Sequence, residues 1–177
     1  MPGRGESQLP GRAITSFVCR PLTLSEDNLA DGYHDQRKEK AMIFHINRAT
    51  YKAGISEEQR QWGLDMARQC GAVSAVKSYV VGPELGGEFE YCFVYVLEDL
   101  DGYWTYLTSP AHVREELEGT PLIEKFAAVD VSDSDDPELG KKIAALQARN
   151  LEEHPDVAAV IAQAASFTMP DGKGPAA

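Results

Sequence analysis

Cysteine is scarce in this chain, and the sequence has no long apolar run. Its three cysteines, Cys19, Cys70 and Cys92, are odd in number and form no CxxC pair. They therefore exclude a disulfide framework and a cysteine-based zinc site, and they are typical of a reducing compartment. No stretch reaches the roughly 20 uninterrupted apolar residues that a membrane-spanning helix needs. The N-terminus also lacks the basic-then-apolar pattern of a secretory signal, so we expect a cytoplasmic protein with no membrane partner.

Basic residues are too few and too scattered for a nucleic-acid surface. The chain has 17 Lys and Arg against 28 Asp and Glu, a formal net charge of −11. The nearest approach to a basic run, Arg37, Lys38 and Lys40, is interrupted by Glu39. Because binding to nucleic acid depends largely on neutralising phosphates with clustered cations, we expect no nucleic-acid partner. The acidic surplus favours solubility instead.

Motifs for nucleophile, metal and nucleotide chemistry are missing as well. There is no GxSxG, HxH or CxxC spacing. The glycine-rich stretch 82–87 connects two expected strands, whereas a phosphate-binding loop connects a strand to a helix. The sequence therefore predicts no metal site and no cofactor.

Composition divides the chain into three parts. Residues 1–40 form an N-terminal extension that begins rich in Gly and Pro and is expected to be partly flexible. Residues 41–132 carry the periodic apolar pattern of a domain. Residues 133–177 begin with an acidic linker, continue with two expected helices at about 136–150 and 156–165, and end in a tail that we expect to be disordered.

The apolar pattern of residues 41–132 predicts the element order β-α-β-β-α-β. Ser56, with Gln59 three residues later, is a capping box that starts the first helix. Ser109–Pro110 starts a second helical piece after a break. Both faces of the strand at 89–97 are largely apolar, so we expect it inside the sheet. The order is that of the ferredoxin-like α+β unit. The expected elements are strands at 42–51, 73–81, 89–97 and 125–131 and helices at 56–70, 99–107 and 109–119.

Pairing between two copies follows from the apolar pattern of the strands. A four-stranded sheet with helices on one face leaves its other face open, and here the first and third strands are apolar on both faces. A symmetric dimer covers such a face, so we expect a homodimeric α/β barrel that the C-terminal helices brace. The alternative is that the two extensions cover the open face within one chain.

Several segments of the domain resemble the stress-responsive dimeric α/β-barrel family. The resemblance covers 42–131 and is carried by Met42–His45, Gly54–Gln59, Val81–Leu85 and above all Tyr106–Val113, which contains Pro-Ala-His-Val. It implies the dimeric barrel fold. The family contains stress-induced proteins, proteins without an assigned role and some enzymes.

A plant polyketide cyclase of this family, which forms olivetolic acid, implies roles for individual residues. Its general base matches His112, the tyrosine that assists the base matches Tyr106, and a pocket histidine of its first strand matches His45. Two pocket positions differ, because a histidine and a tyrosine of that enzyme are replaced here by Tyr91 and Ala67. The resemblance therefore implies acid–base chemistry in a pocket of different shape and polarity.

The residues themselves are consistent with a small-molecule pocket. Histidine transfers protons near neutral pH, and the domain contains two histidines, His45 and His112. Apolar and aromatic side chains should form the remaining walls. We expect the substrate to contact His45, Tyr91, Phe93, and Trp62 and Met66 from one stripe of the first helix. The structural alternative is that His45 is hydrogen-bonded within the core and that His112 braces a loop.

These features favour a cofactor-independent lyase or cyclase that acts on a small aromatic or polyketide-like substrate by His/Tyr general acid–base chemistry. Two alternatives remain open. One is a non-catalytic stress-responsive barrel that binds a small apolar or aromatic molecule, which a closed, packed interior around His112 would favour. The other is a cofactor-free monooxygenase of the antibiotic-biosynthesis type, which would consume oxygen with a phenolic substrate.

Overall fold

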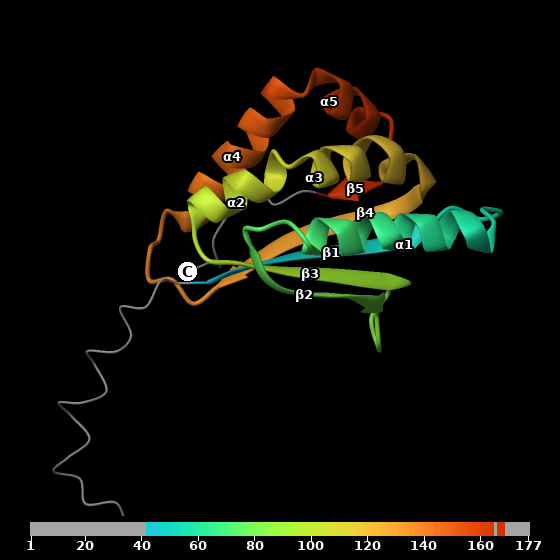
Figure 1. The fold of residues 1–177 in the computed structure, drawn as a ribbon, viewed down its shortest axis with the longest axis horizontal. Coiled ribbons are helices and arrows are strands. Elements are labelled where there is room, and N and C mark those ends of the chain that lie inside the picture. The colour runs from blue at the N-terminus through green and yellow to red at the C-terminus, as the bar shows by residue number, and fades with distance from the viewer. Residues whose placement is uncertain (1–41, 165, 169–177) are drawn as a thin grey trace, which may run out of the picture. The chain divides into compact units, whose positions relative to one another are not determined.

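The computed structural model of the protein describes residues 42–164 and 166–168, so the N-terminal extension and the expected C-terminal tail lie outside the described residues. The elements follow the expected order, with further helices and a short strand after the domain (Figure 1). The strands are β1 (Ile43–Tyr51), β2 (Val76–Pro83), β3 (Tyr91–Leu97), β4 (Ile123–Ser132) and β5 (Phe167–Thr168). The helices are α1 (Glu57–Gly71), α2 (Leu100–Leu107), α3 (Pro110–Arg114), α4 (Leu139–Glu153) and α5 (Pro155–Ala162). Between α3 and β4 lie a π-helix (Glu115–Gly119) and a short 3₁₀ helix (Thr120–Leu122).

The strands form one sheet in the order β2-β3-β1-β4-β5. Strands β1 to β4 pair in antiparallel fashion, and Ile43 of β1 lies opposite Leu97 of β3 on one side and Ser132 of β4 on the other. This is the ferredoxin-like arrangement that the element order predicts. As expected, β3 lies inside the sheet, whereas the parallel pairing of β5 with β4 was not predicted.

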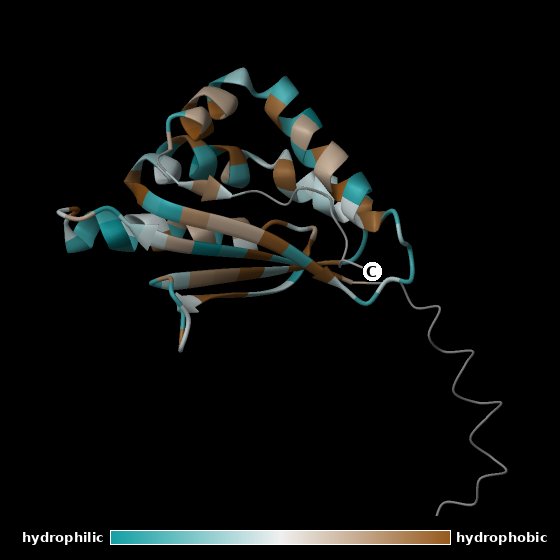
Figure 2. Ribbon diagram, turned by 180° about the vertical axis from the view of Figure 1, so that it is seen from behind, coloured by the Kyte–Doolittle hydropathy of each residue, from teal (hydrophilic) through white to brown (hydrophobic). Residues whose placement is uncertain are grey.

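The two faces of the sheet differ. Along β1, every second side chain from Ile43 to Tyr51 is buried on the face that α1, α2 and α3 cover (Figure 1). On the other face, Phe44 is 37% exposed and Val131, opposite it in the register, is 53% exposed. Val80 and Val129 belong to the same face and are also exposed. Hydrophobic stretches run along the strands (Figure 2), so one apolar face is left uncovered within the described chain.

Helix α1 begins where the sequence predicts. The Ser56 hydroxyl accepts a hydrogen bond from the Gln59 backbone N–H, and the Gln59 side chain accepts one from the Ser56 N–H, so the capping box is complete. The expected buried stripe is only partly right, because Met66 is buried but Trp62 is 40% exposed. The helix buries small residues instead, among them Gly63 and Ala67, and these allow it to approach the sheet closely.

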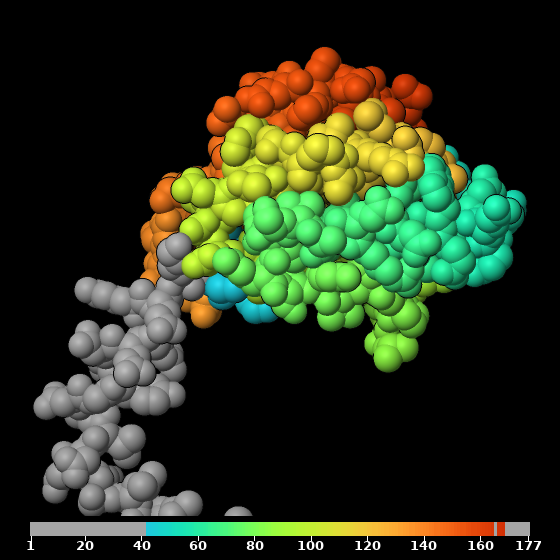
Figure 3. Space-filling view, in the orientation of Figure 1, coloured from blue at the N-terminus to red at the C-terminus, as the bar shows by residue number. Residues whose placement is uncertain are grey.

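The C-terminal helices pack on the helical layer. Helix α4 contacts α2, and α5 contacts both α4 and the π-helix (Figures 1 and 3). Their apolar side chains Ile143 and Val157 are buried there. The alternative in which the C-terminal extension covers the open sheet face is therefore wrong for its described residues, because these side chains already pack on the helices. None of the helices within 42–164 combines the length and the apolar character needed to cross a membrane.

Replacing Gly63 by alanine tests the close packing of α1. A Cβ at this position would lie 2.6 Å from the hydroxyl oxygen of Tyr51, whose side chain is 4% exposed and has little room to move. Alanine favours a helix over glycine by about 1 kcal/mol. We nevertheless expect Gly63→Ala to lower the free energy of unfolding by about 1–3 kcal/mol, as overpacking does.

Urea denaturation measures this change. Gly102→Ala in α2 is the matched control, since its Cβ would lie at an ordinary contact distance of 3.4 Å from Asp99. Equal stability losses in the two variants would show that close packing at Gly63 is not the cause.

Candidate functional site

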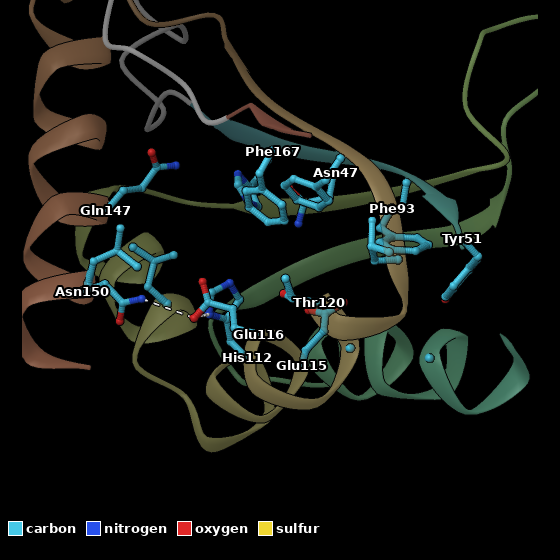
Figure 4. A pocket seen from close by; sticks show the side chains of 18 residues that line it. Asn47, Tyr51, Phe93, His112, Glu115, Glu116, Thr120, Gln147, Asn150 and Phe167 are labelled. Carbon is cyan, nitrogen blue, oxygen red and sulfur yellow. Dashed lines mark hydrogen bonds and ion pairs between the residues drawn. The ribbon is translucent and has the colours of Figure 1, made fainter. Parts of the chain in front are cut away.

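A cavity of about 60 Å³ lies between the sheet and the helical layer (Figure 4). Strand β1, the π-helix, α4 and β5 all contribute to its walls. One part of the lining is apolar or aromatic and consists of Ala49, Tyr51, Phe93, Leu107, Ile123, Phe126, Leu151 and Phe167. The other part is polar and consists of His45, Asn47, His112, Glu115, Glu116, Thr120, Gln147 and Asn150. Gly63 and Gly119 complete the lining.

His45 is held by a hydrogen-bonded chain that crosses four elements. Its Nδ1, on β1, lies 2.8 Å from Asp130 Oδ1 of β4 and 3.1 Å from the Tyr103 hydroxyl of α2. The side-chain amide of Gln147, on α4, donates to that hydroxyl at 2.7 Å. The side chains of His45 and Asp130 are only 3% and 9% exposed. Because Nδ1 faces a carboxylate, Nε2 is the ring nitrogen left for a molecule in the cavity.

His112 lies in α3, whose first turn is fixed by Ser109 and Pro110 as the sequence predicts. The Ser109 hydroxyl accepts a hydrogen bond from the His112 backbone N–H at 3.2 Å. On the ring, Nδ1 lies 3.3 Å from Glu116 Oε2, an ion-pair distance without hydrogen-bond geometry. Burial lowers the pKa of His112, but the negative charges of Glu116 and Glu115 outweigh it, so the pKa is raised above 6.5. The ring is therefore more readily charged than an ordinary histidine.

The π-helix presents acidic groups to the cavity. Helical turns of this kind are rare and occur frequently at functional sites. Here Glu115 opens the π-helix, and its Oε2 accepts a hydrogen bond from the Cys70 thiol at 3.1 Å. Burial raises the pKa of the Glu115 carboxyl and also that of the Cys70 thiol. The carboxyl is thus easier to protonate than usual, while the thiol stays unreactive.

Tyr106, predicted to assist His112, packs behind the cavity wall rather than in the lining. Its ring centroid lies 4.7 Å from that of His112 and 5.7 Å from that of His45. The hydroxyl is buried without a hydrogen-bond partner, and burial raises its pKa well above 10. The phenol therefore stays neutral and acts on the two imidazoles through ring contact.

The predicted site residues separate into two groups. The cavity is lined by His45, Phe93 and His112. Outside its lining lie Tyr91, Trp62 and Met66. Tyr91 packs on Tyr51 with 5.6 Å between the ring centroids, and Trp62 is largely exposed on α1. The structure therefore brings the two histidines together but gives three of the expected substrate contacts no place in this cavity.

The carboxylates and amides of the site were missed in the sequence. Glu115–Glu116 follow His112 at the spacings i+3 and i+4, which place side chains on one helix face, and this pattern could have revealed them. Asp130 interrupts the apolar pattern of β4, which is a weaker signal. Gln147 and Asn150 lie on α4, outside the residues that carry the family resemblance, and no motif marks them.

This arrangement suits proton transfer. Two imidazoles, each beside a carboxylate, line one cavity, and such groups act as general acids and bases. Buried side-chain atoms without a partner cost free energy unless a bound molecule or water satisfies them. Such atoms are Asn47 Oδ1, Tyr106 OH, His112 Nδ1, Gln147 Oε1 and Asn150 Oδ1. Within the described residues, no three His, Cys, Asp or Glu side chains are grouped to hold a metal ion.

Comparison with known proteins identifies a family for most of the domain. The family model of the stress responsive A/B barrel domain matches residues 43–133. Similar solved structures include a dimeric ferredoxin-like protein of unknown function from Thermobifida fusca, with 21% identity over 53% of this chain and 92% of that chain and a TM-score of 0.48. A Dabb family protein with a ferredoxin-like fold from Mesorhizobium loti has 22% identity over 52% and 96%, with a TM-score of 0.47. Hydroxynitrile lyase from Passiflora edulis has 16% identity over 54% and 95%, with a TM-score of 0.47.

The search of curated proteins gave no match. The identities to the three solved structures are between 16% and 22%, and none of these values supports an inference about activity.

Replacing Glu116 by glutamine should lower the pKa of His112. Without the neighbouring carboxylate, burial becomes the dominant influence on the ring and disfavours its charged form. NMR titration of the His112 Cε1 proton measures the shift. Glu118→Gln is the control, since it removes an exposed carboxylate that pairs with Arg114 on the outside of the same helical segment. A His112 pKa that is unchanged or raised in Glu116→Gln would contradict this assignment.

The free energy of unfolding should depend on the same titration of His112. Because the folded pKa of His112 lies above the unfolded value of about 6.5, its charge contributes stability that is fully present below that pH. This contribution is lost as the pH rises through the folded pKa. The free energy of unfolding of the wild type, relative to Glu116→Gln, should therefore fall from mildly acidic to alkaline pH, and a rising difference would refute the sign.

Proposed function

The chain belongs to the stress responsive A/B barrel domain family, and we propose that it is a cofactor-independent lyase or cyclase that works by general acid–base chemistry. One observation carries the proposal: His45 faces Asp130 and His112 faces Glu116 around a single cavity. Two such imidazoles supply an acid and a base within the same small space.

The two histidines differ in their surroundings, and this divides their roles. With Nδ1 held by Asp130, His45 has Nε2 free to accept a proton, whereas the raised pKa of His112 makes it the proton donor. With a β-hydroxy carbonyl substrate, His45 removes the hydroxyl proton and the oxygen becomes a carbonyl. The carbon–carbon bond then breaks, and His112 protonates the carbon that leaves.

The reverse sequence describes a cyclase. His112 then removes a carbon-bound proton, which is the role that the family resemblance implies, and His45 protonates the alkoxide formed when the bond closes. Tyr106 contacts both rings edge-on and holds them in place. All atoms and electrons balance without an external oxidant or reductant.

Cavity size limits the substrate. The cavity has a volume of about 60 Å³, which is less than half of the roughly 150 Å³ that accommodates benzene in a protein core. In this conformation the cavity holds the reacting group of a substrate. A larger aromatic or polyketide-like substrate extends beyond it or displaces wall side chains such as Phe167, which lies on the two-residue strand β5.

A non-catalytic, ligand-binding barrel is the second candidate. The unpaired polar atoms favour binding of a small molecule whether or not it reacts. The cavity beside His112 argues against a purely structural protein, whose interior would be closed and packed there. Among the described residues, no feature favours the monooxygenase alternative.

Proton transfer can be measured without knowing the natural substrate. We expect the wild type to accelerate deuterium incorporation from D₂O into small β-hydroxy carbonyl compounds, with and without a second hydroxyl group, as followed by NMR. His45→Gln and His112→Gln should each lower the rate by about 10²-fold or more, since each removes one proton-transfer group. His154→Gln, between α4 and α5 and outside the cavity lining, is the control.

Two outcomes would decide against catalysis. Saturable binding of these compounds without deuterium exchange in the wild type favours the ligand-binding barrel. Equal exchange rates in the wild type and in both cavity variants show that the reaction does not use this site.

We also propose that the open sheet face pairs with a second copy of the chain and closes the barrel. This face carries exposed apolar side chains on three strands, namely Phe44, Val80, Val129 and Val131. A contiguous apolar face of this kind is typical of a protein interface. The described C-terminal helices lie on the opposite side of the sheet and leave it free.

A charge placed on this face should break the pairing. In a twofold dimer, Val129→Lys introduces one lysine from each copy into the apolar contact. We expect the dissociation constant of the dimer to rise about tenfold or more. Sedimentation equilibrium measures it, and Trp62→Lys is the control because Trp62 is an exposed apolar residue of α1. A wild type that sediments as a monomer would contradict the proposal.

A further inference from the structure

We propose that the cavity selects a neutral molecule, or the head group of one, that carries at least two hydrogen-bond donors, and that the α4 amides of Gln147 and Asn150 impose this selectivity. The inference takes the cavity of the proposed function as its starting point and adds the chemical class of its ligand. Both amides line the cavity from the C-terminal extension, beyond residue 133 where the family match ends (Figure 4).

The Gln147 amide is hydrogen-bonded through its nitrogen. Its nitrogen donates to the Tyr103 hydroxyl at 2.7 Å. That hydroxyl has one proton, which it directs toward Asp130 Oδ2 at 3.4 Å, so its oxygen is free to accept from the amide. The oxygen of the same amide takes no part in this hydrogen bond. It is left buried without a partner in a side chain that is 5% exposed.

A carboxylate lies beside the nitrogen of the second amide. The Asn150 nitrogen lies 3.5 Å from Glu116 Oε2, and an ionised carboxylate can only accept hydrogen bonds. Asn150 is 2% exposed, and its oxygen has no partner. Asn47 of β1 adds a third buried amide oxygen without a partner. Three residues of the lining thus offer acceptors that no donor among residues 42–164 and 166–168 satisfies.

These acceptors define the ligand. Hydroxyl or N–H groups satisfy them, whereas ether or ketone oxygens leave them unpaired. A negatively charged ligand is disfavoured because the carboxylates outnumber the one readily charged imidazole, that of His112. Glu115 and Glu116 line the cavity with it, and Asp130 lies behind His45. The apolar side chains of Phe93 and Phe126 on the wall suit a carbon skeleton. The best match is a compact diol or a similar neutral group with two donors.

Three small probes of similar size separate these properties in the full-length protein. They are 1,2-propanediol, with two donors, 1,2-dimethoxyethane, with acceptors only, and lactate, which is an anion. The side-chain amide signals of Gln147 and Asn150 report binding by NMR. We expect the diol to give saturable shifts with a dissociation constant of about 1–100 mM, and the other two to bind at least about tenfold more weakly.

Two variants test the residues responsible. Gln147→Met and Asn150→Leu keep the approximate size of each side chain and remove the amide. Each should weaken diol binding by about tenfold while leaving 1,2-dimethoxyethane no weaker than in the wild type. Gln69→Leu, at an exposed position of α1, is the matched control. The comparison of the three probes on the wild type remains decisive even where a variant fails to fold.

Several results would overturn the inference: equal binding of the three probes, absence of saturable diol binding, or diol binding that both folded variants retain.

The outcome of this test is separable from the outcome of the test of the proposed function. Selective diol binding without deuterium exchange supports the ligand class and contradicts the enzyme. Exchange that proceeds equally with compounds that lack the second hydroxyl group supports the enzyme and contradicts the ligand class.

Discussion

A single buried hydrogen-bonded chain, from Asp130 through His45 and Tyr103 to Gln147, joins β4, β1, α2 and α4. Buried polar groups are costly unless they are paired, and in a low-dielectric interior a paired network specifies one arrangement of its members. A slip of β1 by one residue would turn His45 to the open face and break its hydrogen bonds to Asp130 and Tyr103. Strand register, helix placement and the chemistry of the cavity therefore depend on the same four side chains.

Local sequence signals predicted the elements of the domain well because their causes are local. The capping box of Ser56 and Gln59 and the Ser109–Pro110 start both involve residues within one helical turn, and both occur as expected. The buried face of α1 was harder to predict. The helical stripe favoured Trp62 together with Met66, yet the structure leaves Trp62 exposed and buries Gly63 and its small neighbours, because the distance between helix and sheet is set by tertiary packing.

The candidate site was predicted in outline only. His45, His112 and Phe93 line the cavity, since alternation along the strands and the Pro-Ala-His-Val segment already place them toward the core. The carboxylate partner of His45 comes from another strand, and the pairing of distant segments leaves little trace in a single sequence. The carboxylate partner of His112 is only four residues away, and that spacing was overlooked. The α4 amides are further removed still. They belong to a segment that completes the helical layer and also supplies the polar side of the cavity, so the site extends beyond the residues that the family model matches.

The short strand β5 has an effect on the sheet that is separate from the cavity. It pairs in parallel with only Phe126 and Ala127 of β4, where the Phe126 N–H donates to the Ser166 carbonyl at 2.9 Å, and Phe167 stacks on Phe126 with 4.2 Å between the ring centroids. Without it, β4 would present a continuous row of unpaired backbone groups, the template on which a strand of another molecule can add. Two residues are enough to interrupt that row. Pairing of another strand along the full length of β4 is thereby interrupted at Phe126 and Ala127.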